Sequence, residues 1–525
     1  MAVRKTNIRV SRLCELSIVM NEKTGAVEMA YKRKIARICV ILFTGCLFLI
    51  AAGMESRTIT YHMLNGTNKI YEETYYLPFG KKVISLEMPG RAESENIRFS
   101  GWYYDRELTM LAKQSLELTK DLDLYAGWIE DNPETEFLLP EMHITSDVAL
   151  ENVDRWEYCS CTYTITNATV DDCLSNVAGQ FRGRGNSTWK EFEKKSYRIK
   201  FEDKQNLFDM GADKDWVLLS NSADYTLMRN ELAFELGKIM ELDYTSQCQW
   251  IQLFYNGEYQ GLYLLCEQVE TGVNRVNIEY PYEPDEIIIS FFLELGGELN
   301  GFSLPLVEGA RDNWEDYFSC EILYPEAEVL SQNQYEYIDA YMQLINVAIL
   351  TKNWEELIEL VDIQSFADWY LVNEIMLNGD MGWSMFAYKP KGDKLYLGPV
   401  WDFDQSCGNS YSGGADYETW YPDTSSQNTW FNTLLEMEEF KELMAERLAS
   451  KLPEIRNLFD REKEKAIIYK QDIDANFERW PVIGTAAWRI REEIGNFKTY
   501  EENVDFLFVW LEHRIDWLEK ELSSF

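Results

Sequence analysis

Apolar residues recur with a period of two in the first half of the chain and with helical spacing in the second half. Short alternating runs predict strands within residues 59–128 and at 161–166, 196–201, 250–255 and 259–265. The Asn256-Gly257 pair between the last two strands predicts a tight hairpin turn. Helical spacing predicts helices at 226–240, 334–351, 363–378, 429–459 and 503–522. The pattern therefore predicts an α+β fold with a small β-rich module near the N-terminus.

Length and composition favour more than one domain. The chain has 525 residues, of which 46% are hydrophobic and 14% aromatic, so most of it should fold, with more than one core. Residues 130–140 are acidic and bounded by proline, and we interpret them as a linker. We expect a β module at 57–129 and a larger domain at 141–525. The net charge of −39 would repel phosphate backbones, so nucleic acid is not expected as a partner.

An uncharged apolar run at 38–54 directly follows a basic segment. Counted from residue 35, the run is about as long as a bilayer is thick, provided that Arg37 extends its charge to the surface. The basic flank belongs on the cytoplasmic side. This predicts a cytoplasmic tail at 1–34, a transmembrane anchor at 35–54 and an extracytoplasmic body. A cleaved signal peptide, with translation starting at Met29, is the main alternative and would give a secreted protein. A lipoprotein at Cys46 fits less well, because the apolar run continues past it.

The ten cysteines do not suggest a disulfide framework. Cys14, Cys39 and Cys46 lie in the expected tail and anchor, which leaves an odd number without metal-ligand spacing. Cys159 and Cys161 lie two residues apart in a predicted strand and so face opposite ways. We expect reduced or buried thiols with at most one incidental disulfide.

Residues 378–407 carry the clearest candidate chemistry. Asp380 lies in a glycine-containing loop, and a predicted hairpin and a strand at 395–400 then lead to Asp402 and Asp404. Carboxylates at i and i+2 of an extended strand point to opposite faces, so we expect one to face a cleft and the other the scaffold. A loop Asp followed about twenty residues later by a strand-end Asp is how kinase-like sites place a base and a metal ligand. A surface hairpin with acidic turn residues is the simpler interpretation.

The first half of the larger domain carries basic residues suited to phosphate. The segment FRGRGNSTWK at 181–190 reads as a glycine-rich turn flanked by Arg182 and Arg184. A strand in KKSYRIKF places Lys195 on the face shared with Tyr197 and Ile199, and a helix and a hairpin follow. This order is that of a kinase N-lobe, although no Walker, HRD or DFG sequence is present. Arg229, in MRNE, is better interpreted as an ion-pair partner than as a phosphate ligand.

The sequence resembles the CotH kinase family, named for a spore coat protein. The blocks RGRGNSTW, KKSYRIKF, DKDWVLLSNSADYTLMRNELAFELG, NGEYQGLYLLCEQV, NRVNI, NGD and GPVWDFDQSCGN occur in order from about residue 138 onward. The resemblance implies an atypical protein-kinase-like domain with a β-rich N-lobe and a helical C-lobe. It also implies that ATP and Mg²⁺ or Mn²⁺ are used to phosphorylate Ser or Thr of proteins.

The resemblance to CotH kinases also assigns roles to residues. Asp380 would be the catalytic acid that orients the acceptor hydroxyl, and Asp402 or Asp404 would hold the metal. The ATP phosphates would contact a basic and glycine-rich set, with Lys195 preferred as the main phosphate ligand: Arg182, Gly183, Arg184, Gly185, Asn186, Lys195, Arg198 and Lys200. Glu231 or Glu235 would pair with that lysine, and Glu267 would be either a hinge residue near adenine or a buried strand-end carboxylate. Ser384 and Met385 stand where kinases carry a metal-binding Asn, which predicts a weak second metal site or none.

The N-terminal module resembles a different family. FSGWYYDRELT and DLDLYAGW occur in the order found in the InlB B-repeat, a β-grasp-like module of bacterial surface proteins. One copy, covering about 70 residues, is present. The resemblance implies a spacer or adhesive role.

Three functions are therefore open. The first is a membrane-anchored or exported kinase that acts on coat, envelope or surface proteins, or on itself. The second is a catalytically inactive scaffold or adhesion protein of the cell or spore surface, favoured by the scarcity of ATP outside cells. The third is phosphoryl or nucleotidyl transfer to a small molecule or glycan. Retention of the three aspartates favours the first.

Overall fold

The computed structural model describes residues 54–63, 70–78, 83–86, 97–104, 106, 112, 115–118, 120–130, 137–168, 172–278, 285–296, 301–306, 317–409, 416–424 and 429–523. The described residues form two compact units, one containing the described residues up to Leu86 together with Trp102–Ala126, and one containing all the other described residues. The expected tail at 1–34 and anchor at 35–54 lie outside the described residues, apart from Met54, which begins a strand. Within the described ranges no helix combines the length and the apolar character needed to cross a membrane.

The first unit is built from strands, as its period-two pattern predicts. Its strands are β1 (Met54–His62), β2 (Ile70–Pro78), β3 (Val83–Ser85), β4 (Ile97–Tyr103), β5 (Ser115–Glu117) and β6 (Leu122–Glu130). Four of them form a sheet in the order β2-β1-β6-β4, and β3 pairs with β5. The β1 and β6 strands run parallel. Ile59, Trp102 and Leu124 form part of its core.

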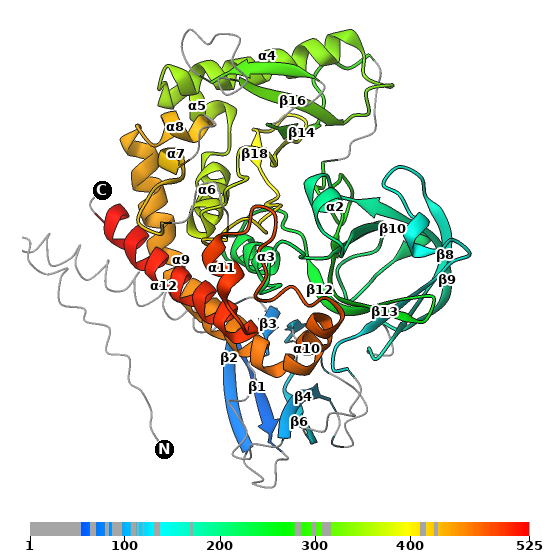
Figure 1. Ribbon diagram of the computed structural model, residues 1–525. Coiled ribbons are helices and arrows are strands. Elements are labelled where there is room, and N and C mark those ends of the chain that lie inside the picture. Colours follow the sequence, from blue (N-terminus) through cyan, green and yellow to red (C-terminus); the bar gives the residue numbers. More distant parts are fainter. Residues whose placement is uncertain are drawn as a thin grey trace, which may run out of the picture. The chain divides into compact units, whose positions relative to one another are not determined.

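Seven strands of the second unit close into a barrel (Figure 1). They are β7 (Glu141–Thr145), β8 (Cys159–Thr166), β9 (Leu174–Arg184), β10 (Ser196–Gln205), β11 (Asp213–Leu219), β12 (Cys248–Tyr255) and β13 (Glu258–Glu267). The order is β10-β11-β13-β12-β7-β8-β9, and closure removes the exposed sheet edges. The Asn256-Gly257 turn joins β12 to β13 with both residues at positive φ, as predicted.

The closed barrel does not show the expected kinase-like two-lobed layout. The strands expected to form an N-lobe close on themselves around a core that includes Phe181, Ile199, Trp216 and Leu265. The end of barrel strand β9 occupies the segment that the sequence suggested was a glycine-rich turn. Cys159, Cys161 and the other described cysteines are all free thiols.

The rest of the second unit is helical with one further sheet. The helices are η1 (Leu150–Asn152), α2 (Ser187–Glu191), α3 (Arg229–Ile239), α4 (Gln332–Leu350), α5 (Trp354–Leu360), α6 (Ile363–Met376), α7 (Tyr421–Thr424), α8 (Trp430–Leu434), α9 (Glu438–Ile468), α10 (Lys470–Arg479), α11 (Glu492–Asn496) and α12 (Tyr500–Leu522). The sheet has the order β15-β16-β14-β17-β18, with β14 (Phe291–Leu295), β15 (Phe302–Pro305), β16 (Tyr317–Tyr324), β17 (Met385–Lys389) and β18 (Tyr396–Leu397). The helix predicted at 429–459 is two helices, α8 and α9, and the strand predicted at 395–400 is only two residues long.

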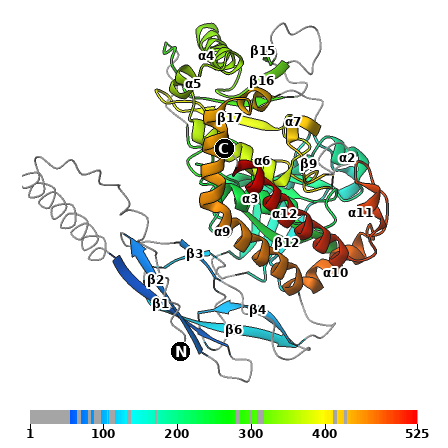
Figure 2. The same ribbon diagram turned by 90° about the vertical axis from the view of Figure 1, so that its left-hand side faces the viewer.

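Helix α3 joins the barrel to the helical part. It packs on α6 and α9, and one apolar core contains its residues together with Val217 and Trp250 of the barrel. Figure 1 shows α3 between the barrel and α6, and Figure 2 shows α9 and α12 lying side by side. This packing brings the outer face of β9 and β10 opposite the segment that follows α6.

Candidate functional site

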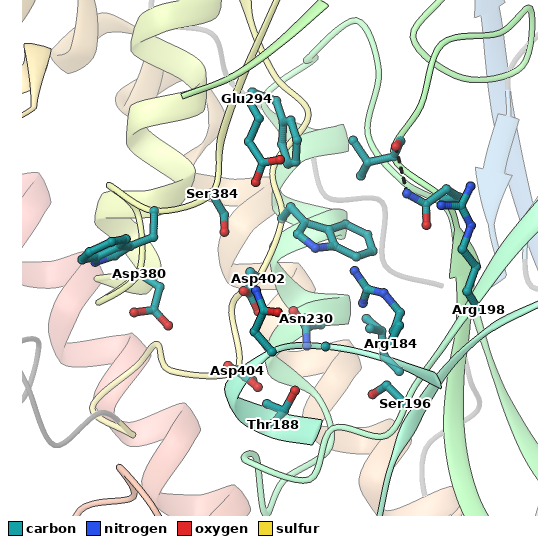
Figure 3. Close-up of a pocket in the computed structure, with 18 of the residues that line it drawn as sticks. Arg184, Thr188, Ser196, Arg198, Asn230, Glu294, Asp380, Ser384, Asp402 and Asp404 are labelled. Atoms are coloured by element: carbon teal, nitrogen blue, oxygen red, sulfur yellow. Dashed lines mark hydrogen bonds between the residues drawn. The ribbon is translucent and has the colours of Figure 1, made fainter. Parts of the chain in front are cut away.

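A cavity of about 1310 Å³ opens between the barrel and the helical part (Figure 3). The barrel contributes the end of β9, the start of β10 and the loop that leads into α2. The opposite wall comes from the turn after α6, the segment after β18 and the loop before α11. The charged side chains that line it are Arg155, Arg182, Arg184, Arg198, Glu270, Glu294, Glu326, Asp380, Asp402, Asp404 and Arg489. Carboxylates and guanidinium groups therefore line the same cavity.

Alternation along β9 explains why its arginines reach the cavity. Phe181 and Gly183 point into the barrel, whereas Arg182 and Arg184 lie on its outer face. A Cβ at Gly183 would lie 2.2 Å from the Trp189 ring, so this glycine permits close packing of α2. The loop proper begins at Gly185, with a φ of 101°. What looked like a glycine-rich turn is thus a strand end followed by a short loop.

The Arg184 guanidinium is the cation most available to a ligand. It stacks on the Trp401 ring at 5.1 Å and forms no ion pair within the described part of the chain. Burial lowers the pKa of Arg184. By contrast, Arg182 donates to the carbonyl of Arg155, and Arg155 donates to the carbonyl of Gly185 at 2.6 Å.

Asp380 is held in the turn that ends α6. Leu377 caps the helix in the left-handed conformation, with a φ of 43°. The Asp380 backbone N–H donates to the Asn378 side-chain oxygen at 3.2 Å, and Asn378 in turn donates to Asn373 at 3.1 Å. Burial, then the nearby Asp402 charge, raises the pKa of Asp380 to about 6, and the Arg489 guanidinium at 4.0 Å opposes that shift. The turn therefore presents a perturbed carboxylate to the cavity.

Asp402 and Asp404 line the same cavity, which corrects the expectation that they face opposite ways. The reason is the backbone, because Asp402 has a φ of 66° and the segment is not extended there. Burial raises the pKa of Asp402, and the Arg184 charge opposes this. Burial, then the Asp402 and Asp380 carboxylates, raises the pKa of Asp404 well above its usual value. Figure 3 draws Asp402 between Asp380 and Arg184.

The first turn of α3 anchors the segment that carries these aspartates. Asn230 accepts a hydrogen bond from the Phe403 N–H at 2.9 Å, and Arg229 donates to the Ser406 carbonyl at 2.9 Å. Arg229 is buried and pairs with Asp224, as expected for an ion-pair partner. The MRNE block thus positions the acidic segment from within the core.

Arg198 and Lys200 both form an ion pair with Asp215, but only Arg198 lines the cavity. Arg198 lines the cavity and pairs with Asp215 at 2.9 Å and with Glu270 at 3.6 Å. Lys200 also pairs with Asp215, at 3.3 Å, but does not line the cavity. Of the two, only Arg198 is placed to reach a cavity ligand.

The preference for Lys195 as the phosphate ligand is not supported by its position. Its ammonium donates to the carbonyls of Trp189, at 2.5 Å, and Phe192, and it does not line the cavity. Lys195 was expected on the face of Tyr197 and Ile199, and both of these point into the barrel core. The cavity follows the other face of β10, that of Ser196 and Arg198.

The expected pairing of Glu231 or Glu235 with Lys195 is not formed. Glu231 pairs with Lys465 of α9, and Glu235 pairs with Lys238 at 2.6 Å. The reason is that α3 packs against α9. These acids belong to the α3–α9 contact and not to the cavity.

Glu267 is a buried strand-end carboxylate, which was one of its two interpretations. It pairs with Arg275 at 2.6 Å and accepts from the Tyr244 hydroxyl at 3.1 Å. Burial raises the pKa of Glu267 to about 7. It does not line the cavity, so it is not placed as a hinge residue.

Several cavity residues had no signal in the sequence. Trp488 and Arg489 come from a loop far along the chain, and Glu294 comes from β14, where no strand was predicted. Burial raises the pKa of Glu294 to about 7. Asn230 and Gln405 lie inside the sequence blocks that resemble CotH kinases, but nothing in their spacing indicated that they line a cavity. Only the folded chain brings these residues together.

The sequence between residues 181 and 518 matches the family model described as CotH kinase protein. The match covers more than half of the chain, so the chain belongs to this family. No curated protein matches it. The family match spans every charged residue of the cavity except Arg155.

Proposed function

We propose that the chain is a CotH-type kinase that transfers the γ-phosphate of ATP to Ser or Thr hydroxyls of proteins. One observation carries the proposal: Asp380, Asp402 and Asp404 lie in one cavity with Arg184, whose guanidinium forms no ion-pair contact in the described residues and lies near enough to Asp402 for their charges to interact. Phosphoryl transfer depends mainly on positioning and on charge neutralisation, and such a set supplies both. The site's size also suits a nucleotide beside part of a protein acceptor.

The acidic pair fits a divalent cation. Asp402 and Asp404 are close enough for one charge to raise the pKa of the other, and a cation would relieve that repulsion. Within the described ranges, no three His, Cys, Asp or Glu side chains are grouped as a metal site. Mg²⁺ usually takes only one or two carboxylates and completes its shell with phosphate and water oxygens. When bound, Mg²⁺ or Mn²⁺ would neutralise charge on the phosphates.

In this proposal, two cavity arginines bind the nucleotide and Asp380 binds the acceptor hydroxyl. Arg184 and Arg198, on the barrel side, would bind phosphate oxygens through their guanidinium groups. Asp380, when ionised, would accept the proton of the acceptor hydroxyl and orient its oxygen. The new bond joins that oxygen to the γ-phosphorus as the bond to the leaving ADP breaks.

We also propose that the larger unit acts outside the cytoplasm, on a coat, envelope or surface protein. The apolar run at 35–54 with its basic flank supports an anchor or export signal. The β module would serve as a spacer or adhesive module. Protease added to intact cells should remove the described part of the chain, and full protection would contradict this location.

Labelled ATP tests the activity. Purified protein with Mg²⁺ or Mn²⁺ should label itself or an added protein on Ser or Thr. Asp380→Asn should keep nucleotide binding and lose transfer, whereas Asp402→Asn should weaken metal-dependent binding, measured by calorimetry. A wild-type protein that transfers no phosphate would instead favour the scaffold function. Equal ATP affinity in wild type and Asp402→Asn would move the metal role to Asp404.

A further inference from the structure

Gln405 is a buried amide for which the fold supplies no partner. It follows Asp404 directly, lines the cavity and is 4% exposed. Neither its Oε1 nor its Nε2 atom forms a hydrogen bond within the described part of the chain. Buried amides are nearly always hydrogen-bonded, because an unpaired one has lost water without compensation. A polar side chain in this state at a cavity wall indicates a ligand.

The other side-chain amides of the cavity wall already form hydrogen bonds within the protein. Asn230 donates to Asn221 and accepts from the Phe403 N–H. Asn221 donates to the Leu227 carbonyl, and Asn186 accepts from Arg155. Gln405 therefore differs from its neighbours in having both donor and acceptor unpaired.

The backbone around Gln405 is fixed. Arg229 holds the Ser406 carbonyl, and the Asn409 side chain donates to the Asp404 carbonyl at 2.6 Å. Ser406 donates to the Phe403 carbonyl at 2.7 Å. The backbone on either side of Gln405 is therefore pre-organised, and this residue directly follows Asp404 at the cavity wall.

We propose that the Gln405 carboxamide contacts the nucleotide's phosphates and the cation that accompanies them, a role that rests on the proposed kinase function. Its Nε2 group donates to a phosphate oxygen, and its Oε1 atom supplies an oxygen ligand beside Asp404. Kinases place a metal-binding Asn shortly after the catalytic Asp, and this chain has Ser384 and Met385 there. Gln405 supplies the missing amide from a different segment.

The test compares two buried glutamines. Gln405→Met keeps the length of the side chain and removes both hydrogen-bonding groups. Gln252→Met makes the same change in β12, where Gln252 is fully buried, donates to Asp472 and accepts from Tyr259. Each variant is unfolded thermally without ligand. Each is then titrated with adenylyl imidodiphosphate and Mg²⁺ by calorimetry.

A ligand-binding role predicts opposite results for the two variants. The melting temperature of Gln405→Met should equal that of the wild type or lie about 1 °C above it, because the substitution removes no hydrogen bond of the folded protein. It should bind the analogue roughly ten- to a hundredfold more weakly. Gln252→Met should melt several degrees lower, because its partners become unpaired, and should keep the affinity of the wild type.

Other results would overturn the inference in distinguishable ways. Wild-type affinity in Gln405→Met removes the role of the amide and leaves the proposed kinase function standing. A melting temperature that falls as far as that of Gln252→Met shows that the amide supports the fold. If the wild-type protein binds no analogue, the proposed function fails, and the inference fails with it.

Discussion

Arg184 and Lys195 show that the charge of a residue does not by itself predict whether the residue can bind phosphate. The contacts of the charged group in the folded protein decide this. Both residues lie near the same strand pair, and both were candidates for the ATP phosphates. The Lys195 ammonium is taken up by two carbonyls at the end of α2, whereas Arg184 keeps its guanidinium unpaired against Trp401. The sequence could not separate them, because only the folded chain brings the two carbonyls to Lys195 and the Trp401 ring to Arg184.

Nucleotide affinity should therefore follow Arg184. Arg184→Met should weaken ATP binding by roughly tenfold or more, since a charged hydrogen-bond donor to phosphate is lost. Lys195→Met should leave ATP affinity near that of the wild type and lower thermal stability. Calorimetric titration of both variants checks this. A larger loss of ATP affinity in Lys195→Met than in Arg184→Met would support Lys195 as the main phosphate ligand, as the sequence suggested.

Asp380 should give transfer a dependence on pH near neutrality. Burial raises its pKa to about 6, and only the ionised form can accept the hydroxyl proton. The value of kcat/KM should therefore rise with pH through a midpoint near 6. Arg489→Gln removes the positive charge that opposes the shift, so the midpoint should move upward. A pH profile with the same midpoint in both proteins would show that Asp380 does not control the rate.

At the scale of elements, the sequence predicted the helices and strands whose apolar residues recur with a regular period within the segment itself. Helix α3, the β12–β13 hairpin and the strands β8 and β10 lie close to their expected positions. It missed β9, and the end of this strand at 181–184 was interpreted as part of a glycine-rich turn. Gly179 and Gly183 of this strand meet close neighbours: a Cβ at Gly179 would lie 2.5 Å from the Lys200 carbonyl oxygen. Close packing between distant segments leaves no periodic signal in the chain.

The same limit applies to the acidic segment. The motif located Asp380, Asp402 and Asp404, but the extended-strand rule assigned the latter two to opposite faces. The left-handed backbone at Asp402 could not be anticipated, because it is held by contacts to α3 far away in the sequence. Trp488 and Arg489 were missed for a similar reason, since only the fold brings their loop to Asp380.

The start of α3 should therefore be more important to stability than a surface ion pair. Arg229→Met leaves Asp224 buried and unpaired and releases the Ser406 carbonyl, which should cost about 3–5 kcal/mol. Arg456→Met breaks a pair with the exposed Asp516 and should cost about 0–1 kcal/mol. Urea unfolding of both variants measures the difference. Similar losses would mean that the buried pair contributes little.

At the scale of the whole molecule, the second unit begins earlier than its motifs suggest. Residues 130–140 were expected as a linker, yet Leu139 is 2% exposed and its N–H donates to Asp472 of α10 at 3.0 Å. The Phe137 ring packs on Tyr259 at 5.2 Å, and the Pro140 carbonyl accepts from Gln252. The contacts of these few residues with β12, β13 and α10 make them part of the packed unit.

Two truncated chains test this boundary. Every described residue of the cavity lies in the second unit, so a chain of residues 133–525 should bind ATP and Mg²⁺ with the affinity of the full-length protein. A chain of residues 141–525 loses the buried Leu139 side chain, worth about 2 kcal/mol, and leaves Asp472 without its backbone donors. It should melt several degrees lower than the longer chain in thermal unfolding. Equal melting temperatures would place the boundary at residue 141, and loss of nucleotide binding by residues 133–525 would show that the first unit contributes to the site.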